Sequence, residues 1–417
     1  MKRSLIIFTT LAMLLSMSAC AKQETKPSVQ PDAKQEEKPV YSVPAPMSTP
    51  DYTFSGTPTT DQLRQTALQG MRDLLSIQWH TATEISYYKT GPMSHKRFEH
   101  LPKNIYAGTL YSNASTGIFQ FMEFYNQETG ELKYPGEPHE LKEAIGNSCA
   151  DSLLWGYSTV CNSITGGFFP ATMVYANGYI PVGRYTYDYS IDNYNKYPSS
   201  KIVKSNGEAI ILESYTMVKP ADALVSTTAN HAMMVVGEAK VYYNGDGSID
   251  LANSYIPIQD QRAGSGEGFY DEIVDGYLVH FSGRTTYDFP FSELLEKHYI
   301  PVTTAEFMGT KPYEKATATL SQDCTTVNDM LRAKIEANYP LAVVRVTVTD
   351  TDGIKTVIGR ELFGGDAATG VPRTFMLSYM DCLIEFEKSE YNKAGNTLLL
   401  EAIVSTGECF KLAELTI

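Results

Sequence analysis

The clearest helical pattern in the chain follows Thr59. Thr59 and Gln62 have the spacing of a capping box, in which each side chain bonds the backbone N–H of the other residue at a helix start. Apolar residues then recur at helical spacing, at Leu63, Ala67, Met71, Leu74 and Leu75. The pattern predicts a helix with one buried stripe that begins after Thr59 and ends near Trp79.

Near the C-terminus the pattern changes to that of β-strands. Valines recur between Leu341 and Thr349, and an Asp-Thr-Asp-Gly turn then leads into a second β-rich run. A third β-rich run covers residues 396–404. We therefore expect residues 305–417 to form a small β-sandwich that follows a larger domain at residues 58–304.

The first twenty residues have the form of an export signal. Two basic residues precede an apolar run of 13 residues from Leu5 to Met17, which is shorter than the ~20 residues that a membrane-spanning helix needs. The small residues before Cys20 resemble the cleavage box of bacterial lipoproteins, in which that cysteine is lipidated. The sequence thus predicts a lipoprotein signal peptide at residues 1–20; the alternative is an ordinary signal peptide with an incidental cysteine.

The segment that follows the signal has the composition of a tether. Residues 21–57 are rich in Lys, Gln, Glu, Pro, Ser and Thr, so they have little apolar surface to bury. We expect a disordered linker there, with the protein held outside the cytoplasmic membrane by a lipid anchor at Cys20.

Charge and cysteine content exclude several classes of protein. With 34 Lys and Arg against 48 Asp and Glu, the net charge of −14 argues against a nucleic-acid partner, because binding phosphates needs basic surfaces. Six cysteines without short paired spacings exclude a disulfide-dense scaffold and a zinc ribbon. The histidines lack the spacing of a zinc-binding helix. We expect a monomer that needs no metal and no organic cofactor.

Cys149 is the candidate nucleophile. It follows Gly-Asn-Ser, and the apolar residues after it have helical spacing. A thiol in the first turn of a helix lies near unpaired N–H groups and the positive end of the helix dipole, which favours the reactive thiolate. The alternative is a buried structural cysteine, which is the role that we expect for Cys161.

His231 is the candidate base. It opens an apolar strand, and a hairpin signal at Asn-Gly-Asp-Gly leads to an expected return strand at residues 249–258. A cysteine nucleophile needs a base that takes and returns its proton, and the base needs an amide or carboxylate that orients it. Asn253 is our first choice for the orienting residue and Asp250 the alternative; strand alternation allows at most one of them.

The order of these motifs resembles the NlpC-type cell-wall peptidases of the papain-like superfamily. "GNSCADSLLWGY" is similar to that family's Asp-Cys-Ser-Gly-Phe helix start, "VKPADAL" to its Leu-x-Pro-Gly-Asp-Leu turn, and "HAMMVV" to its His-Val-x-Ile-x-Ile strand. Upstream, "IYAGTLYSNAS" resembles its Tyr-x-x-Gly-Gly segment, whose tyrosine helps to hold the oxyanion. The resemblance covers about residues 85–262 and implies this role for Tyr111, with Tyr106 as second choice.

This resemblance implies an α+β, papain-like fold in which a helix-borne cysteine packs on an antiparallel sheet. It also implies a surface-anchored cysteine peptidase or amidase that cleaves peptidoglycan stem peptides or another extracellular peptide. The residues leave two alternatives open. One is a catalytically silent surface protein that binds glycan or peptide, and the other is a transglutaminase-like enzyme or a general cysteine protease.

Overall fold

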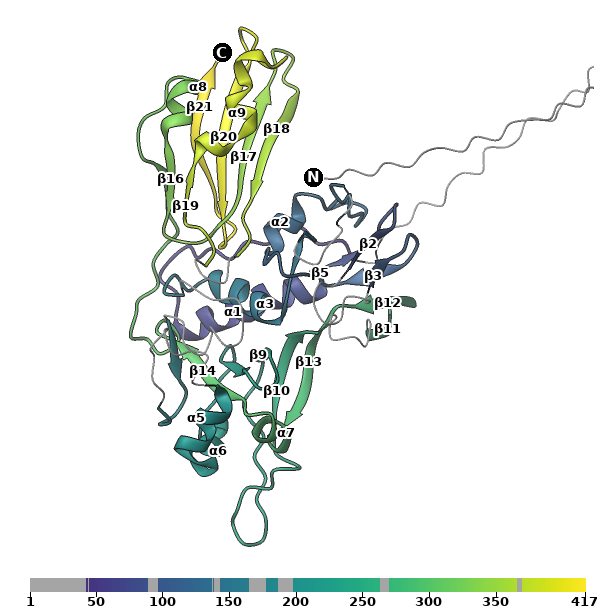
Figure 1. Ribbon diagram of the computed structural model, residues 1–417, viewed down its shortest axis with the longest axis vertical. Coiled ribbons are helices and arrows are strands. Elements are labelled where there is room, and N and C mark those ends of the chain that lie inside the picture. Colours follow the sequence, from purple (N-terminus) through teal and green to yellow (C-terminus); the bar gives the residue numbers. More distant parts are fainter. Residues whose placement is uncertain are drawn as a thin grey trace, which may run out of the picture. The chain divides into compact units, whose positions relative to one another are not determined.

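A computed structural model of the chain (Figure 1) describes residues 43, 45–88, 97–136, 138, 143–164, 178–186, 198–262, 270–365 and 370–417. The predicted signal peptide with Cys20 lies outside the described residues. Residues 41–417 form one compact unit of mixed α/β composition. In the part of the chain that the structure describes, no helix is long and apolar enough to cross a membrane.

The helices are short apart from the first. They are α1 (Thr60–Ser76), α2 (Ile118–Met122), α3 (Cys149–Ser158), α5 (Ser199–Asn206), α6 (Glu208–Thr216), α7 (Phe291–Glu296), α8 (Val327–Arg332) and α9 (Asp381–Ile384), with 3-10 turns η2 (Leu377–Tyr379) and η3 (Phe386–Lys388). The prediction of α1 is confirmed, including the reciprocal capping box between Thr59 and Gln62. Its apolar stripe is buried, and the helix ends three residues before Trp79, at Ser76.

A six-stranded antiparallel sheet supports the site. Its order is β13 (Gly283–Pro290), β10 (Tyr255–Gln261), β9 (His231–Val235), β8 (Ala223–Ser226), β14 (Ile300–Thr304) and β7 (Tyr179–Pro181). Helix α1 packs on α3, and α3 packs on β9 and β10, so the helix that begins at Cys149 lies against the strand that begins at His231. The largest apolar core fills the space between these helices and the sheet.

Three smaller sheets adjoin this core. The first has the order β1 (Gln78–Trp79), β4 (Ile105–Ala107), β12 (Tyr277–Phe281) and β11 (Tyr270–Val274); the second pairs β2 (Ile85–Tyr88) with β3 (Arg97–His100); the third pairs β5 (Leu110–Tyr111) with β6 (Gly146–Asn147). The β5–β6 pair is parallel and matches Tyr111 with Asn147. It therefore brings Tyr111 close to the start of α3, although the two segments lie far apart in the sequence.

The C-terminal strands form two further antiparallel sheets. One has the order β18 (Lys355–Leu362), β17 (Leu341–Thr349), β20 (Thr397–Val404) and β21 (Cys409–Thr416), and the other has the order β15 (Ala318–Leu320), β16 (Lys334–Ala337) and β19 (Thr374–Met376). The strands predicted after Leu341 and before Val404 are confirmed as β17, β18 and β20. A separate apolar core belongs to this C-terminal part.

The C-terminal part binds the end of α3. The carbonyl of Ser158, the last residue of the helix, accepts a hydrogen bond from the Ser405 hydroxyl at 2.5 Å. Four residues further on, the Asn162 carbonyl accepts one from the Arg373 guanidinium at 2.8 Å. A cation near a helix C-terminus is favourable, because the unpaired carbonyl groups carry partial negative charge. The far end of the cysteine helix is thus held by residues more than 200 positions away in the sequence.

The last part of the predicted tether differs from the expectation. Tyr52 is only 4 % exposed, its hydroxyl donates to the Asp73 carboxylate on α1 at 2.7 Å, and its backbone N–H donates to the Thr406 carbonyl. Val43 is also buried. The polar composition of the segment gave no sign that Val43 and Tyr52 are buried. A single aromatic side chain such as Tyr52 buries enough surface to fix a segment that otherwise has little apolar area.

Arg64 on α1 and Asp222, before β8, form a buried ion pair. Their side chains are 6 % and 2 % exposed, and the Nη1 to Oδ1 distance is 2.8 Å. The same guanidinium donates to the Pro220 and Phe307 carbonyl groups and lies over the Phe307 ring. Every face of the Arg64 cation therefore has a partner, and the pair joins the first helix to the turn that precedes the site strands.

We expect Arg64→Met to lower the free energy of unfolding by about 3–5 kcal/mol, because it leaves the buried Asp222 charge without its partner. Urea unfolding followed by circular dichroism measures this change. The control is Arg184→Met, which breaks an exposed pair with Glu213 (69 % and 45 % exposed) and should change the same quantity by less than about 1 kcal/mol. Equal effects of the two substitutions would contradict the assignment of Arg64 as a structural anchor.

Candidate active site

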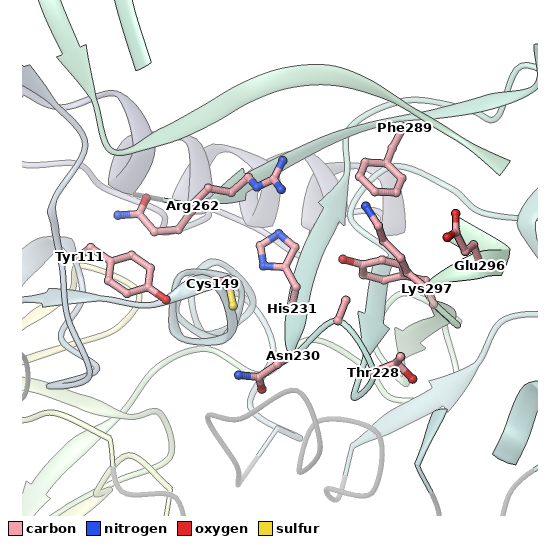
Figure 2. A pocket seen from close by; sticks show the side chains of 12 residues that line it. Tyr111, Cys149, Thr228, Asn230, His231, Arg262, Phe289, Glu296 and Lys297 are labelled. Carbon is pink, nitrogen blue, oxygen red and sulfur yellow. The ribbon is translucent and has the colours of Figure 1, made fainter. Parts of the chain in front are cut away.

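A pocket of about 550 Å³ opens where the start of α3 faces the edge of β9 and β10 (Figure 2). Cys149 and His231 both line it, and Tyr111 lines it on the other side of Cys149. The structure thus brings together three of the four catalytic residues expected from the sequence.

Cys149 is the first residue of α3. Ser148 is the N-cap, and both its backbone N–H (3.1 Å) and its hydroxyl (2.6 Å) donate to the Asp151 carboxylate. The N–H of Cys149 has no acceptor within the helix, because the first residues of an α-helix have no preceding turn. The thiol is 6 % exposed, so it reaches the pocket through a small area while the rest of the residue is packed.

Asp151 is a buried carboxylate in the first turn of the same helix. Burial raises its pKa to about 6, against the lowering effect of its hydrogen bonds from Ser148. The group remains an acceptor for Ser148, and this bond fixes the backbone at the point where the chain turns from β6 into α3. The sequence Asn-Ser-Cys therefore gives a well-capped cysteine helix.

Tyr111 reaches the site from β5. Its neighbour across the sheet is Asn147, two residues before Cys149, and its carbonyl accepts a hydrogen bond from the Tyr87 hydroxyl at 2.8 Å. Burial, and next the charges on Cys149 and Asp151, raise the pKa of the Tyr111 hydroxyl, so this hydroxyl remains a proton donor. Tyr106, the second choice, packs on Trp79 away from the pocket, and its hydroxyl accepts from the Leu101 N–H.

His231 is oriented by Asp260. The distance from His231 Nε2 to Asp260 Oδ2 is 2.7 Å, and the two side chains are 15 % and 0 % exposed. Strands β9 and β10 pair with Val235 opposite Ile258 and Met234 opposite Gln259. Because side chains alternate along a strand, this register places the His231 and Asp260 side chains on the same face of the sheet.

The assignment of Asn253 as the orienting residue is wrong, and so is the alternative of Asp250. Asn253 is exposed and Asp250 is half-buried, and they bond each other, with Asn253 Nδ2 at 2.6 Å from Asp250 Oδ2. The return strand begins at Tyr255 rather than at Ile249, so both residues lie in the turn before it. The strand that pairs with β9 is consequently β10, which begins further along the chain than the hairpin signal suggested.

Asp260 has a dense set of partners. Its Oδ2 atom accepts from the Tyr287 hydroxyl at 3.0 Å and lies 3.5 Å from Arg262 Nε. The other oxygen, Oδ1, is buried without a hydrogen-bond partner among the described residues. A carboxylate with such surroundings is held rigidly, so it can fix both the ring position and the tautomer of His231.

The electrostatics favour a charged His231. Burial lowers its pKa, but the negative charge of Cys149 and the hydrogen bond and charge of Asp260 outweigh this effect and raise the pKa from 6.5 to about 9. With Nε2 bound to Asp260, the Nδ1 atom is left for the hydrogen bond to Cys149. At neutral pH the imidazole is therefore protonated, with the Asp260 carboxylate on one side and the Cys149 sulfur on the other.

Sequence reasoning missed Asp260, although the chain carries a signal for it. Ile256 and Ile258 are both buried, and with alternation Asp260 falls on the same face of β10. A carboxylate on the apolar face of a strand requires a buried partner. The histidine that opens the neighbouring strand is that partner.

Among the described cysteines, only Cys149 lines the pocket. Cys161 is 0 % exposed and lies 3.5 Å from the Thr304 hydroxyl, and burial raises the pKa of its thiol. Cys324, Cys382 and Cys409 are free thiols in the C-terminal part. Within the described ranges, no group of three His, Cys, Asp or Glu side chains is placed to hold a metal ion.

We compared the chain with protein-family models, with curated proteins and with solved structures, and none of the three comparisons gave a match.

Proposed function

We propose that the chain is a surface-anchored cysteine peptidase or amidase with a papain-like, NlpC-type catalytic domain. The observation that carries the proposal is the line of Cys149, His231 and Asp260 at the edge of an open pocket. A helix-start thiol, a protonated imidazole beside it and a buried carboxylate behind the imidazole are the three roles that thiol-dependent amide hydrolysis requires.

The chemistry follows from the positions of these groups. The Cys149 thiolate attacks the amide carbonyl carbon, and the negative charge moves to the carbonyl oxygen, where the Cys149 N–H and the Tyr111 hydroxyl can donate. The C–N bond then breaks, and His231 gives its proton to the departing amine. Water attacks the resulting thioester with His231 as base, which releases the acid and restores the thiolate–imidazolium pair.

Peptidoglycan stem peptides are the proposed substrates, cleaved at an amide that involves D-Glu or a diamino acid. Support comes from the order of the motifs around Cys149 and His231 and from the export signal with its cysteine at position 20. The pocket is lined by polar, charged and aromatic groups, which suits a peptide with ionised groups better than a lipid.

The test combines labelling with digestion. We expect a thiol-directed alkylating probe at neutral pH to label Cys149 first among the described cysteines, and we expect labelling to stop the release of new amine groups from purified peptidoglycan. Mass spectrometry locates the label and identifies the fragments. Digestion of a casein-like protein at a comparable rate would favour a general protease, and unlabelled Cys149 with no digestion of either substrate would favour a binding protein.

Anchoring of the protein is a separate prediction. We expect Cys20→Ala to move the protein from the membrane fraction to the soluble fraction, because residues 21–57 offer no other apolar anchor and stable anchoring needs more than one acyl chain on the cysteine. Fractionation followed by immunoblotting measures the change. Retention of the variant in the membrane fraction would contradict lipidation at Cys20.

A further inference from the structure

The pocket extends past His231 into a second region that the reaction steps above do not use. The carboxylate of Glu296, the last residue of α7, lines this region, and four further residues line it as well: Arg262 from the end of β10, Phe289 from β13, and Lys297 and Tyr299 from the segment between α7 and β14. We call these four residues the leaving-side subsite. Figure 2 shows Arg262 beside the His231 ring and Lys297 further from that ring, next to Phe289, whereas Tyr111 lies across Cys149 from them.

The polar groups of the leaving-side subsite are mostly donors. A guanidinium and an ammonium group have N–H donors and no acceptor, and a tyrosine hydroxyl donates while its pKa is high. Burial, and next the charges of Cys149 and Asp260, raise the pKa of Tyr299, so its hydroxyl keeps its proton. The side chain of Tyr299 is 2 % exposed, and among the described residues its hydroxyl has no hydrogen-bond partner.

Neighbouring carboxylates hold the two cations in place. Asp260 Oδ2 lies 3.5 Å from Arg262 Nε. Glu293 lies 2.8 Å from Lys297 Nζ, and that ammonium also lies over the Phe289 ring. Asp260 is fully buried behind His231, so the carboxylate that a ligand in the pocket meets beside these donors is that of Glu296.

The position of His231 indicates which part of a substrate lies next to these donors. His231 protonates the departing amine, so the amine lies on the His231 side of Cys149, opposite Tyr111. We propose that Arg262, Lys297 and Tyr299 bind a carboxylate carried by the leaving amine, with the Phe289 and Tyr299 rings against its carbon atoms. This inference rests on the proposed function and narrows it to amides whose released amine bears a carboxylate next to the scissile bond.

Two tetrapeptide libraries test the inference. Both contain L- and D-residues without acidic side chains; one has a free C-terminal carboxylate and the other a C-terminal carboxamide. Cleavage of the last amide bond is followed by mass spectrometry. We expect the free acids to have a kcat/KM about 10- to 100-fold higher, the range of a lost hydrogen bond to a charged group, with most of the difference in KM.

Variants connect this preference to the residues. Arg262→Gln should bring the ratio of the two kcat/KM values toward one, and Arg262→Lys should restore part of it, because a lysine keeps the charge. The alkaline limb of the pH–rate profile of Arg262→Gln shows how Arg262 acts. If Arg262 binds the substrate, the limb stays at the wild-type pH; if Arg262 acts through Asp260, the limb moves. Asn253→Ala, in the exposed turn before β10, is the control and should leave the ratio unchanged.

Binding distinguishes failure of this inference from failure of the proposed function. The Cys149→Ala protein is dialysed against each library, and retained peptides are counted. Preferential retention of free acids by the Cys149→Ala protein, together with cleavage of neither library by the wild type, would support the subsite and reject the hydrolase. Equal cleavage and equal retention of both libraries would overturn the subsite while the hydrolase stands.

Discussion

Replacement of Cys149 by alanine is expected to lower kcat/KM for amide hydrolysis by about 10⁵- to 10⁶-fold, the scale of removing the nucleophile from a catalytic triad. In the proposed mechanism the thiolate forms the only covalent bond to the substrate, and no other thiol among the described residues lines the pocket. The small side chain fits the start of α3, where the Ser148–Asp151 cap is independent of the thiol. The rate of amine release from peptidoglycan measures the loss.

The matched control is Cys409→Ala, which removes an exposed thiol from the C-terminal part. It should retain the wild-type rate, and both variants should unfold at denaturant concentrations close to that of the wild type. Full activity of Cys149→Ala would exclude the mechanism. A large loss in Cys409→Ala would instead indicate that a different thiol matters.

Replacement of Asp260 by asparagine is expected to lower kcat by about 10⁴-fold, as for the carboxylate of other triads. The asparagine keeps the size of the side chain but removes the negative charge that raises the pKa of His231. At the same time, its amide group can turn a donor toward Nε2 and select the wrong tautomer. The effect should therefore fall on kcat more than on KM.

The pH dependence gives the same variant a second readout. In the wild type, activity should fall as the pH rises through about 9, where His231 loses its proton. Asp260 raises that pKa, so the alkaline limb of Asp260→Asn should lie at lower pH. A stopped assay across pH 6 to about 10 measures the position of the alkaline limb in both proteins.

Asn253→Ala is the control for this profile, because Asn253 bonds Asp250 in an exposed turn. We expect neither its rate nor its alkaline limb to change. An Asp260→Asn variant with the wild-type limb would contradict a charged contact between Asp260 and His231, and a loss of rate in Asn253→Ala would restore the hairpin assignment.

Tyr287 and Arg262 link this triad to the surrounding sheet. Tyr287 donates to the same carboxylate oxygen that binds His231, and the Arg284 guanidinium lies over the Tyr287 ring. The carboxylate therefore depends on three strands, β9, β10 and β13, for its position. A buried carboxylate is costly unless donors satisfy it. Asp260 has donors in His231 and Tyr287, so it is compatible with a stable sheet at this place.

The sequence alone located the elements whose signals are local. Capping boxes, helical spacing and strand alternation depend on residues within a few positions, so the helix after Thr59, the helix start at Cys149, the strand at His231 and the strands after Leu341 could all be predicted. The candidate nucleophile and base followed from these positions. Tyr111 followed only from the resemblance to a family.

Only the tertiary structure decided which groups meet these residues. The partner of His231 depends on the register between β9 and β10, which a long turn separates. Because β10 begins at Tyr255 and not at Ile249, Asp260 rather than Asn253 bonds His231. Arg262, Lys297 and Tyr299 come together because β10 and the segment after α7 border the same pocket. Local patterns carry no information about such contacts, since they are fixed by long-range packing of the sheet on α3.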